Sequence, residues 1–237
     1  MDEGKTDVLR VYVSDTAPLK DGDLFARALA LVSPARRDKA LRLPHREEQR
    51  RSVAAELLLK MALRDRGLPW KELRWGFGGE GKPLLPDFPG FFFSLSHSGD
   101  YAMAAVSGAE VGCDVERLRA VKPGLAERFF CPEEAEYIAS LPGEEGRRLF
   151  FRCWTLKESF LKATGLGLRL PMNAFCILPG EDGQARVRQS VDERSYRLFD
   201  RAWPEGYHSA VCAAGPVSGV RWEEADLGEL VRALEKG

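Results

Sequence analysis

The chain has 237 residues, a net charge of −1, 44% hydrophobic residues and 30% charged residues. This length suits one large domain or two small ones, and the composition is ordinary for a soluble globular protein. The nearly balanced charge excludes a large electrostatic footprint for nucleic acid, and no run reaches the roughly 18 apolar residues of a membrane helix. The opening residues MDEGKTDVLR lack the layout of a signal peptide, so we expect a cytoplasmic protein.

The first part of the chain predicts both strands and helices. Helices are expected at 23–32 and 46–65, the second ending at Gly67. Ser33 and Pro34 have the residue types of an N-cap and a first helical position, so another helix begins there. A loop rich in Gly and Pro is predicted from Gly78 to Gly90. Apolar segments predict strands at 8–13, 73–77, 91–96, 101–106 and 111–116.

The second part has a similar plan. A helical stretch covers about 124–165, with breaks at Pro132 and at Pro142-Gly143, and a final helix covers about 224–236. Strands are expected between them near 174–178, 186–190, 196–201 and 208–214. Each half therefore has a long helix followed by antiparallel strands. We predict an α+β, pseudo-dimeric chain of two similar halves, 1–117 and 118–237, each with an antiparallel sheet packed on a long helix.

The cysteines predict no metal site. No pair of the five has C-x-x-C spacing, and three histidines are too few for a zinc cluster. We expect buried, reduced thiols, as is usual in a cytosolic protein, at Cys113, Cys131, Cys153, Cys176 and Cys212.

Two carboxylates are predicted side by side on one strand. Asp114 and Glu116 are two residues apart, so both point to one face while Val115 points to the other, into a core. Like charges repel, and a hard cation such as Mg²⁺ with oxygen ligands would relieve the repulsion. The alternative is an exposed edge strand whose carboxylates pair with Arg117.

A second charged pair lies on the long helix of the second half. Trp154, Glu158 and Lys162 are spaced i, i+4 and i+8 and so share a face, from which a carboxylate and an ammonium could bind metal and phosphate together. The alternative is an ordinary surface ion pair. The neighbouring residues are largely apolar, which favours a buried helix and therefore a functional pair.

Three further segments concern phosphate. Seven Arg or Lys residues between Arg36 and Arg51 form either a solvated helix face or an anion site. Ser96 and His97 are adjacent on a strand and point to opposite faces, so they do not form a nucleophilic dyad; His97 suits a hydrogen bond to a phosphate or a structural role. The stretch from Gly76 to Lys82 matches a phosphate loop only in part, because Pro83 replaces Ser or Thr and no helix follows.

Together these segments resemble the Sfp-type phosphopantetheinyl transferases over most of the chain. The resemblance is carried by Ser33-Pro34 with the Arg-rich helix, by Gly81-Lys82-Pro83, and by the segments 93–99 (FSLSHSG), 112–116 (GCDVE) and 151–168, which fits W-x-x-K-E-x-x-x-K-x-x-G-x-G-L. One departure is Cys113, where the family usually has a β-branched residue. Another is Arg36, where some relatives have Lys.

The resemblance implies roles for ten residues. The Mg²⁺ ligands would be Asp114, Glu116 and Glu158, with Glu158 also the candidate general base, directly or through water, although metal contact lowers basicity. Lys162 would act in catalysis and reach the pyrophosphate of coenzyme A (CoA). The other CoA ligands would be Arg36, Lys39, Arg51, Lys82, Ser96 and His97, with Arg36 and Lys39 chiefly at the 3′-phosphate. Trp154 and Lys157 match positions that shape the site.

The implied reaction transfers 4′-phosphopantetheine from CoA to a serine of an apo acyl or peptidyl carrier protein and releases 3′,5′-ADP. Such carriers serve fatty acid, polyketide and nonribosomal peptide biosynthesis. We expect a monomer, because an internal duplication can supply both sides of the site, and no nucleic-acid or membrane partner. The carrier is predicted to dock in the groove between the halves and near Leu125, Phe129 and Phe130, with Arg128 at the rim, unless these Phe side chains are core.

Two other functions remain open from the sequence. One is a Mg²⁺-dependent hydrolase of phosphate esters, which shares the carboxylate and lysine chemistry. The other is a non-catalytic module that binds CoA or a carrier; the complete set of three carboxylates argues against it.

Overall fold

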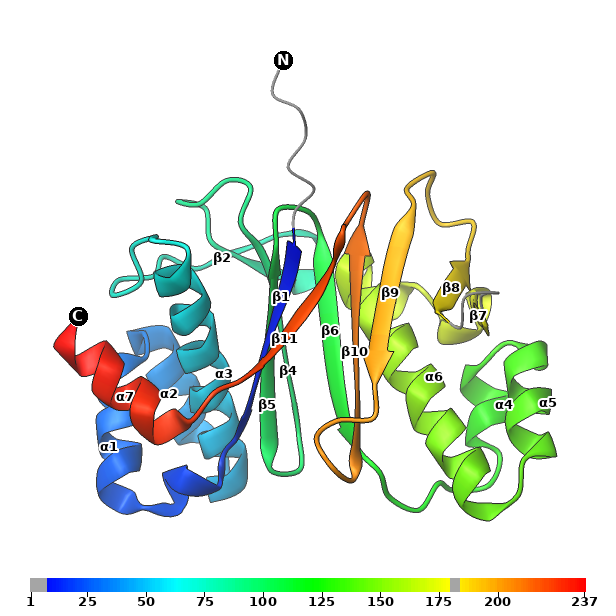
Figure 1. Ribbon diagram of the computed structural model, residues 1–237, viewed down its shortest axis with the longest axis horizontal. Helices are drawn as coiled ribbons and strands as arrows, with labels where there is room; N and C mark the ends of the chain where they lie inside the picture. The colour runs from blue at the N-terminus through cyan, green and yellow to red at the C-terminus, as the bar shows by residue number, and fades with distance from the viewer. Residues whose placement is uncertain (1–7, 180–183) are drawn as a thin grey trace.

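Two β-sheets stand side by side in the middle of the molecule, and helices cover their outer faces (Figure 1). The computed structural model describes residues 8–179 and 184–237. Within them, one sheet has the strand order β11-β1-β5-β4 and the other β6-β10-β9. The only parallel pair in these two sheets is β1 with β11. The strands are β1 (Val8–Asp15), β4 (Phe92–Ser98), β5 (Tyr101–Ser107), β6 (Val111–Arg117), β9 (Tyr196–Arg201), β10 (Tyr207–Ala214) and β11 (Gly219–Glu224).

The helices form two groups. The four-stranded sheet is covered by α3 (Arg46–Asp65), and α1 (Gly22–Leu31), α2 (Pro34–Arg42) and α7 (Leu227–Lys236) pack on α3. The three-stranded sheet is covered by α6 (Gly143–Thr164); α5 (Pro132–Ser140) packs on α6, and α4 (Leu125–Phe129) packs on α5. Two short ribbons complete the fold, β2 (Gly76–Phe77) with β3 (Pro83–Leu84), and β7 (Cys176–Pro179) with β8 (Ala185–Arg188). Among the residues described, no helix is both long and apolar enough to cross a membrane.

Strand alternation decides which side chains reach the helices. On β6, Cys113 and Val115 are fully buried in an apolar core that also contains Val11 of β1 and Val211 of β10. Because successive residues of a strand point to opposite faces, Asp114 lies on the face of β6 that is covered by α6. The predicted alternation around Val115 is confirmed.

Serine side chains join the two sheets where β4 lies beside β6. No backbone ladder connects these two strands in the described chain. Instead, Ser94 Oγ accepts a hydrogen bond from the Cys113 N–H at 3.0 Å, and Ser98 Oγ accepts one from the Arg117 N–H at 3.2 Å. Ser96, between them, is thereby brought beside the face of β6 that carries the carboxylates.

Helix α6 crosses β6 in very close contact at Gly112. A Cβ added to Gly112 would lie 2.0 Å from the Ser159 carbonyl oxygen, 2.4 Å from the Ala163 nitrogen and 2.8 Å from the Lys162 carbonyl carbon. These atoms all belong to the α6 backbone. Only glycine therefore lets the helix lie this close to the strand.

Most predicted elements are present, and some differ in extent. Ser33 caps α2, with its Oγ accepting a hydrogen bond from the Arg36 N–H, and the chain leaves α3 through Gly67 at a φ of +67°. The predicted 78–90 loop contains the two-residue strand β3. The final helix was predicted to begin near residue 224, but Gly219–Glu224 form β11, and α7 follows Asp226, its N-cap.

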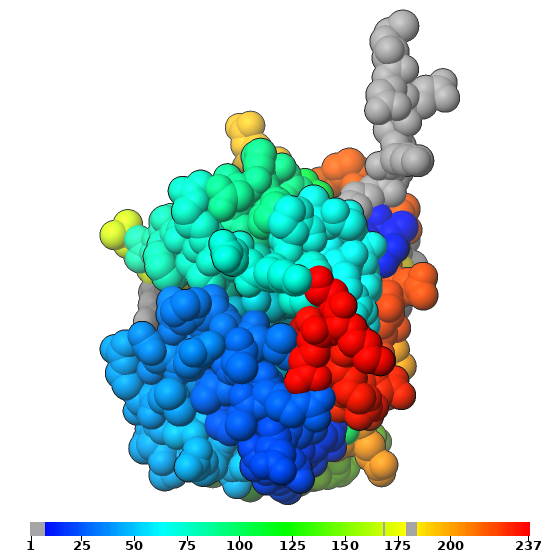
Figure 2. All heavy atoms as spheres, turned by 90° about the vertical axis from the view of Figure 1, so that its left-hand side faces the viewer, coloured from blue at the N-terminus to red at the C-terminus, as the bar shows by residue number. Residues whose placement is uncertain are grey.

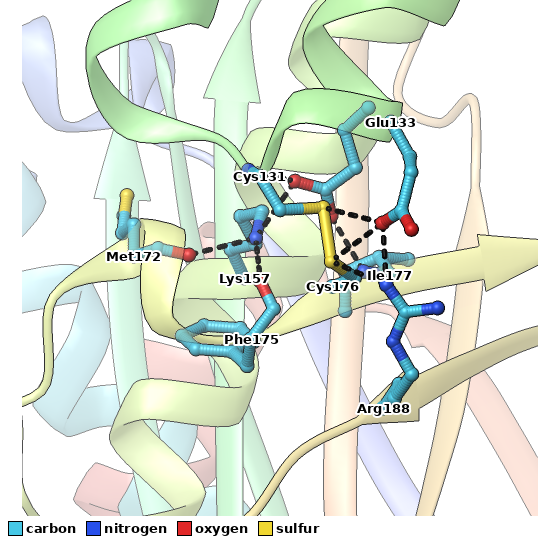
Figure 3. Close-up of a disulfide and its surroundings, with 9 residues drawn as sticks. Cys131, Glu133, Lys157, Met172, Phe175, Cys176, Ile177 and Arg188 are labelled. Atoms are coloured by element: carbon cyan, nitrogen blue, oxygen red, sulfur yellow. Dashed lines mark hydrogen bonds and ion pairs between the residues drawn. A yellow bond between two sulfur atoms is a disulfide. The ribbon is translucent and has the colours of Figure 1, made fainter.

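The prediction that all cysteines are reduced is wrong for two of them. Cys131, at the start of α5, and Cys176, in β7, form a disulfide with a Cα–Cα distance of 5.7 Å (Figure 3). The packing of α5 on β7 brings together two residues that are 45 positions apart. As predicted, Cys113, Cys153 and Cys212 are buried free thiols.

The disulfide lies beside a carboxylate, but this cluster is not a convincing metal site. Possible ligand atoms of Cys131, Glu133 and Cys176 lie within 4.8 Å of one another. Both sulfur atoms are bonded to each other, and the Glu133 carboxylate forms an ion pair with the Arg188 guanidinium. The neighbouring positive charge of Arg188 further disfavours a cation.

Candidate active site

A cavity of about 580 Å³ lies where the two sheets meet, with walls from α2, β4, β6 and α6. Eight of the ten predicted site residues line it: Arg36, Lys39, Lys82, Ser96, His97, Asp114, Glu158 and Lys162. The other two are not among its lining residues. Arg51 donates to the Gly99 carbonyl oxygen at 2.7 Å, and Glu116 accepts a hydrogen bond from Ser98 Oγ at 2.8 Å.

Asp114 and Lys162 form the polar centre of the cavity. Asp114 is 4% exposed, and its Oδ1 accepts hydrogen bonds from Lys162 Nζ and Ser96 Oγ, both at 2.7 Å. Lys162 also donates to the Cys113 carbonyl oxygen at 2.9 Å. Burial is the largest influence on the pKa of Lys162 and lowers it, but the charge and hydrogen bond of Asp114 together with Cys113 and Glu158 outweigh burial and raise the pKa above its usual value, so Lys162 stays cationic.

The second oxygen of Asp114 has no partner. Among the described residues, Asp114 Oδ2 is a buried oxygen without a hydrogen bond. An ionised oxygen in this state is costly unless a cation or donor contacts it. A bound ligand or ion is therefore the expected partner of Oδ2.

Glu116 and Glu158 share the electrostatic environment of Asp114. Burial is the largest cause that raises the pKa of each glutamate, and the negative charge of Asp114 raises both further. The three carboxylates are not gathered into a ligand cluster as tight as the one at the disulfide. Mutual repulsion and an unpartnered buried oxygen nevertheless fit a hard divalent cation with oxygen ligands.

Positive side chains occupy the other walls. Lys82 forms an ion pair with Glu110 and donates to the Ala163 carbonyl oxygen at 3.3 Å. His97 is accessible from the cavity, but desolvation by the surrounding walls lowers its pKa, and the charge of Arg51 lowers it further. The His97 imidazole is therefore neutral near pH 7 and can donate one N–H to an anion.

Arg36 is held by residues that the sequence reasoning missed. Its Nε donates to the fully buried Glu56 carboxylate at 3.2 Å, and its guanidinium lies 5.3 Å from the centre of the Trp75 ring. Glu56 lies in the mostly apolar stretch 53–63 of α3, and a carboxylate among apolar residues was the signal that could have identified it.

Lys157 and Trp154 lie away from the cavity, although they belong to the same motif. Lys157 is fully buried, forms an ion pair with Glu134 at 2.8 Å, and donates to the carbonyl oxygens of Met172 and Phe175 at 2.8 and 2.6 Å (Figure 3). Neither Lys157 nor Trp154 is among the residues that line the cavity. Their contribution to the site is to hold α6 in place. The side chain of Leu168, the last motif residue, lies outside the described residues.

The predicted docking residues are partly core. Phe130 is 2% exposed and packs against Phe150 in a tilted arrangement with ring centroids 5.1 Å apart. Phe129 and Leu125 are only partly buried, and Phe129 packs edge to face on Trp154 at 5.7 Å. The core alternative therefore holds for Phe130, while Leu125 and Phe129 keep some exposed surface.

Comparison with known proteins gives the same family over residues 18–212. Residues 18–109 match the model for the 4′-phosphopantetheinyl transferase N-terminal region, and residues 110–212 match that for the 4′-phosphopantetheinyl transferase superfamily. The 4′-phosphopantetheinyl transferase ffp of Bacillus subtilis is 33% identical over 80% of this chain and 85% of its own. The psf-1 enzyme of Bacillus pumilus is 31% identical over 89% and 92% of the two chains.

A further sequence relative and a solved structure were also found. The 4′-phosphopantetheinyl transferase HetI of a Nostoc species is 38% identical over 86% of this chain and 82% of its own. A solved holo-(acyl-carrier-protein) synthase of Bacillus anthracis, in complex with CoA (3′,5′-ADP), has a TM-score of 0.41 and 18% identity, and covers 46% of this chain and 97% of that one. From the sequence matches, the chain belongs to the 4′-phosphopantetheinyl transferase superfamily.

Proposed function

We propose that the chain transfers the 4′-phosphopantetheine arm of CoA to a serine of an apo acyl or peptidyl carrier protein and releases 3′,5′-ADP. The observation that carries this proposal is the charge arrangement of the 580 Å³ cavity. A buried carboxylate with an unpartnered oxygen, Asp114, lies beside the Lys162 ammonium, and the other walls supply Arg36, Lys39 and Lys82. A pyrophosphate accompanied by a divalent cation, with a further phosphate at some distance, requires such a combination.

Asp114, Glu116 and Glu158 would hold Mg²⁺ at this site. The unpartnered Asp114 Oδ2 and the raised pKa values of both glutamates support this assignment. When bound, Mg²⁺ would neutralise charge on the pyrophosphate oxygens. The remaining chemistry depends on side chains of this protein and on the carrier.

In the proposed step, the carrier serine oxygen bonds to the β-phosphorus while the bond from that phosphorus to the bridging oxygen of the leaving 3′,5′-ADP breaks. Lys162, which stays cationic, offsets the charge that develops on the leaving group. Glu158 accepts the serine proton, directly or through water, and its raised pKa suits a base. Ser96 is no competing nucleophile, because its hydroxyl is engaged by Asp114 and Lys162.

We also propose that the chain is a monomeric, cytoplasmic enzyme of two related halves, 1–117 and 118–237. Helix α3 packs on β4 and β5 much as α6 packs on β6 and β10, which supports an internal duplication. The C-terminal elements β11 and α7 return to the first half, where they pair with β1 and pack on α1 and α3. The first half would supply most CoA phosphate contacts, and both halves would supply metal ligands.

The test is the intact mass of an apo carrier protein after incubation with the enzyme, CoA and Mg²⁺. We expect a gain of one phosphopantetheine, lost on addition of EDTA and in Asp114→Ala. Asp87→Ala is the matched control, because Asp87 is a surface carboxylate paired with Arg74, and it should keep full activity. Reactions with an acyl carrier and with a peptidyl carrier, run separately, show which carrier is modified and so indicate the pathway served.

Two results would contradict the proposal. CoA consumed without any carrier gaining mass would favour the hydrolase, and binding of CoA without turnover would favour the non-catalytic module. Near-normal turnover by Glu158→Gln would refute the role of Glu158 as base.

A further inference from the structure

Glu56, on α3, is a fully buried carboxylate at the edge of the cavity wall. Its neighbour Ala55 lines the cavity, while the Glu56 side chain has no solvent exposure. Its Oε1 accepts a hydrogen bond from the Ser33 N–H at 2.6 Å, and its Oε2 accepts from Ser33 Oγ at 3.0 Å and from Arg36 Nε at 3.2 Å. A buried carboxylate is tolerated when donors satisfy both oxygens, and three donors here hold Glu56 in one position.

Arg36 is the one member of this group that reaches the cavity. The Glu56 carboxylate uses its Nε, and no hydrogen bond in the described chain uses either Nη group. The Arg36 guanidinium carbon lies over the Trp75 ring, and Trp75 is itself fixed, since its Nε1 donates to Ser33 Oγ at 3.0 Å. The guanidinium is thus held by Glu56 at its Nε and by the Trp75 ring beneath it, and its Nη pair is left as the fork available to a phosphate.

We infer that Glu56 is a positioning residue for recognition of the CoA 3′-phosphate, acting through the guanidinium of Arg36. This inference rests on the proposed function. The pyrophosphate end of the cavity is defined by Asp114 and Lys162 on β6 and α6, whereas Arg36 comes from α2 on another wall. A phosphate that meets Arg36 would therefore lie on a different wall from the pyrophosphate, and the 3′-phosphate is the remaining phosphate of CoA. The negative charge of Glu56 offsets part of the positive charge of Arg36, but it also fixes the orientation of the guanidinium, which lowers the entropy lost on binding.

The experiment compares CoA with 3′-dephospho-CoA in wild type and Glu56→Gln, with carrier modification as the readout. We expect kcat/KM for CoA to fall by about 10-fold or more, mostly through KM, because a charge-assisted contact loses its geometry. For 3′-dephospho-CoA the change should stay within about threefold, since no phosphate faces Arg36. The preference for CoA, measured as the ratio of kcat/KM for CoA to kcat/KM for 3′-dephospho-CoA, would fall accordingly.

A matched control separates recognition from folding. Glu134 is also a buried carboxylate (5% exposed) near the start of a helix, where it accepts from the Cys131 N–H and pairs with Lys157, but it does not line the cavity. Glu134→Gln should lower thermal stability as Glu56→Gln does, and should leave the preference for CoA unchanged. If Glu56→Gln does not fold, Glu56→Asp keeps the charge, withdraws it by one methylene, and should show the same change in preference.

A double-mutant cycle tests whether Glu56 acts through Arg36. In an Arg36→Ala background, Glu56→Gln should cause no further loss of preference for CoA. The inference would be overturned if Glu56→Gln left the preference for CoA unchanged or increased it. It would also be overturned if Glu56→Gln lowered that preference equally in the Arg36→Ala background. Failure of the proposed function looks different, because wild type would then modify no carrier with either nucleotide.

Discussion

Substitution of Gly112 by alanine tests how the contact between β6 and α6 builds the site. The added Cβ would lie 2.0 Å from the Ser159 carbonyl oxygen, whereas ordinary contacts begin at 3.4 Å, so the two backbones must separate by about 1.4 Å (3.4 − 2.0). No side chain can rotate away to relieve this clash, since all three nearest atoms are α6 backbone. Overpacking of this kind costs about 1–3 kcal/mol.

The same separation would disturb catalysis. Lys162 lies on the displaced segment of α6, and its 2.7 Å contact with Asp114 would lengthen beyond hydrogen-bonding distance. A misplacement of about 1 Å in a catalytic group can cost about 100-fold in rate. We therefore expect Gly112→Ala to lower both the free energy of unfolding, measured by urea denaturation, and the rate of carrier modification.

Gly219→Ala is the matched control for this substitution. Gly219 is also a strand glycine, in β11, but a Cβ there has no atom within 4 Å, and neither glycine has a positive φ. Gly219→Ala should keep normal activity and gain up to about 1 kcal/mol, because alanine restricts the unfolded chain. A Gly112→Ala protein as stable and active as Gly219→Ala would refute the steric argument.

Three further predictions concern titration and the disulfide. The pKa of Glu158 is raised, so the folded carboxyl holds its proton more tightly than the unfolded one, and metal-free protein loses stability as the pH rises above 4.5. Glu158→Gln should therefore melt at a higher temperature than wild type at pH 7–8, and the difference in melting temperature should close toward pH 4.5. No difference at any pH would mean that Glu158 has an ordinary pKa. The lowered pKa of His97 has the opposite effect, so wild type should lose stability relative to His97→Gln as the pH falls below 6.5, and parallel melting curves would contradict this. Removal of the disulfide by Cys131→Ser opens a loop of 45 residues and should lower the free energy of unfolding by about 4 kcal/mol, from the loop-entropy relation. Turnover should change little, because the disulfide does not line the cavity. An unchanged urea midpoint, or alkylation of Cys176 in wild type without reductant, would refute this prediction.

Local periodicity was enough to predict the acidic centre of the site. The two-residue repeat of a strand places Asp114 on the face opposite Val115, and the helical repeat places Glu158 and Lys162 on one face of α6. Both patterns depend only on neighbouring residues. The cap at Ser33 was predictable for the same reason, since its hydrogen bond spans three residues.

Features that depend on distant packing were not predictable. Strand β11 has few buried side chains, so its sequence lacks a clear apolar face, and its partner β1 lies at the other end of the chain. The pairings of Cys131 with Cys176 and of Lys157 with Glu134 likewise arise from packing between α5, α6 and β7. Lys157 precedes Glu158 by one residue, which turns it about 100° around the helix and away from the cavity.

The return of β11 and α7 to the first half also determines when this protein can finish folding. Leu227, Leu230, Val231 and Leu234 of α7 are buried in the same core as α3, and Figure 2 shows this helix in red against the blue N-terminal residues. During synthesis, β1 and α3 leave the ribosome long before the residues that complete their core. The first half must therefore wait, with an open sheet edge and an uncovered apolar face, until residues 219–236 have been translated. A ribosome-stalled chain that ends before β11 should accordingly be protease-sensitive in its first half and a substrate for chaperones.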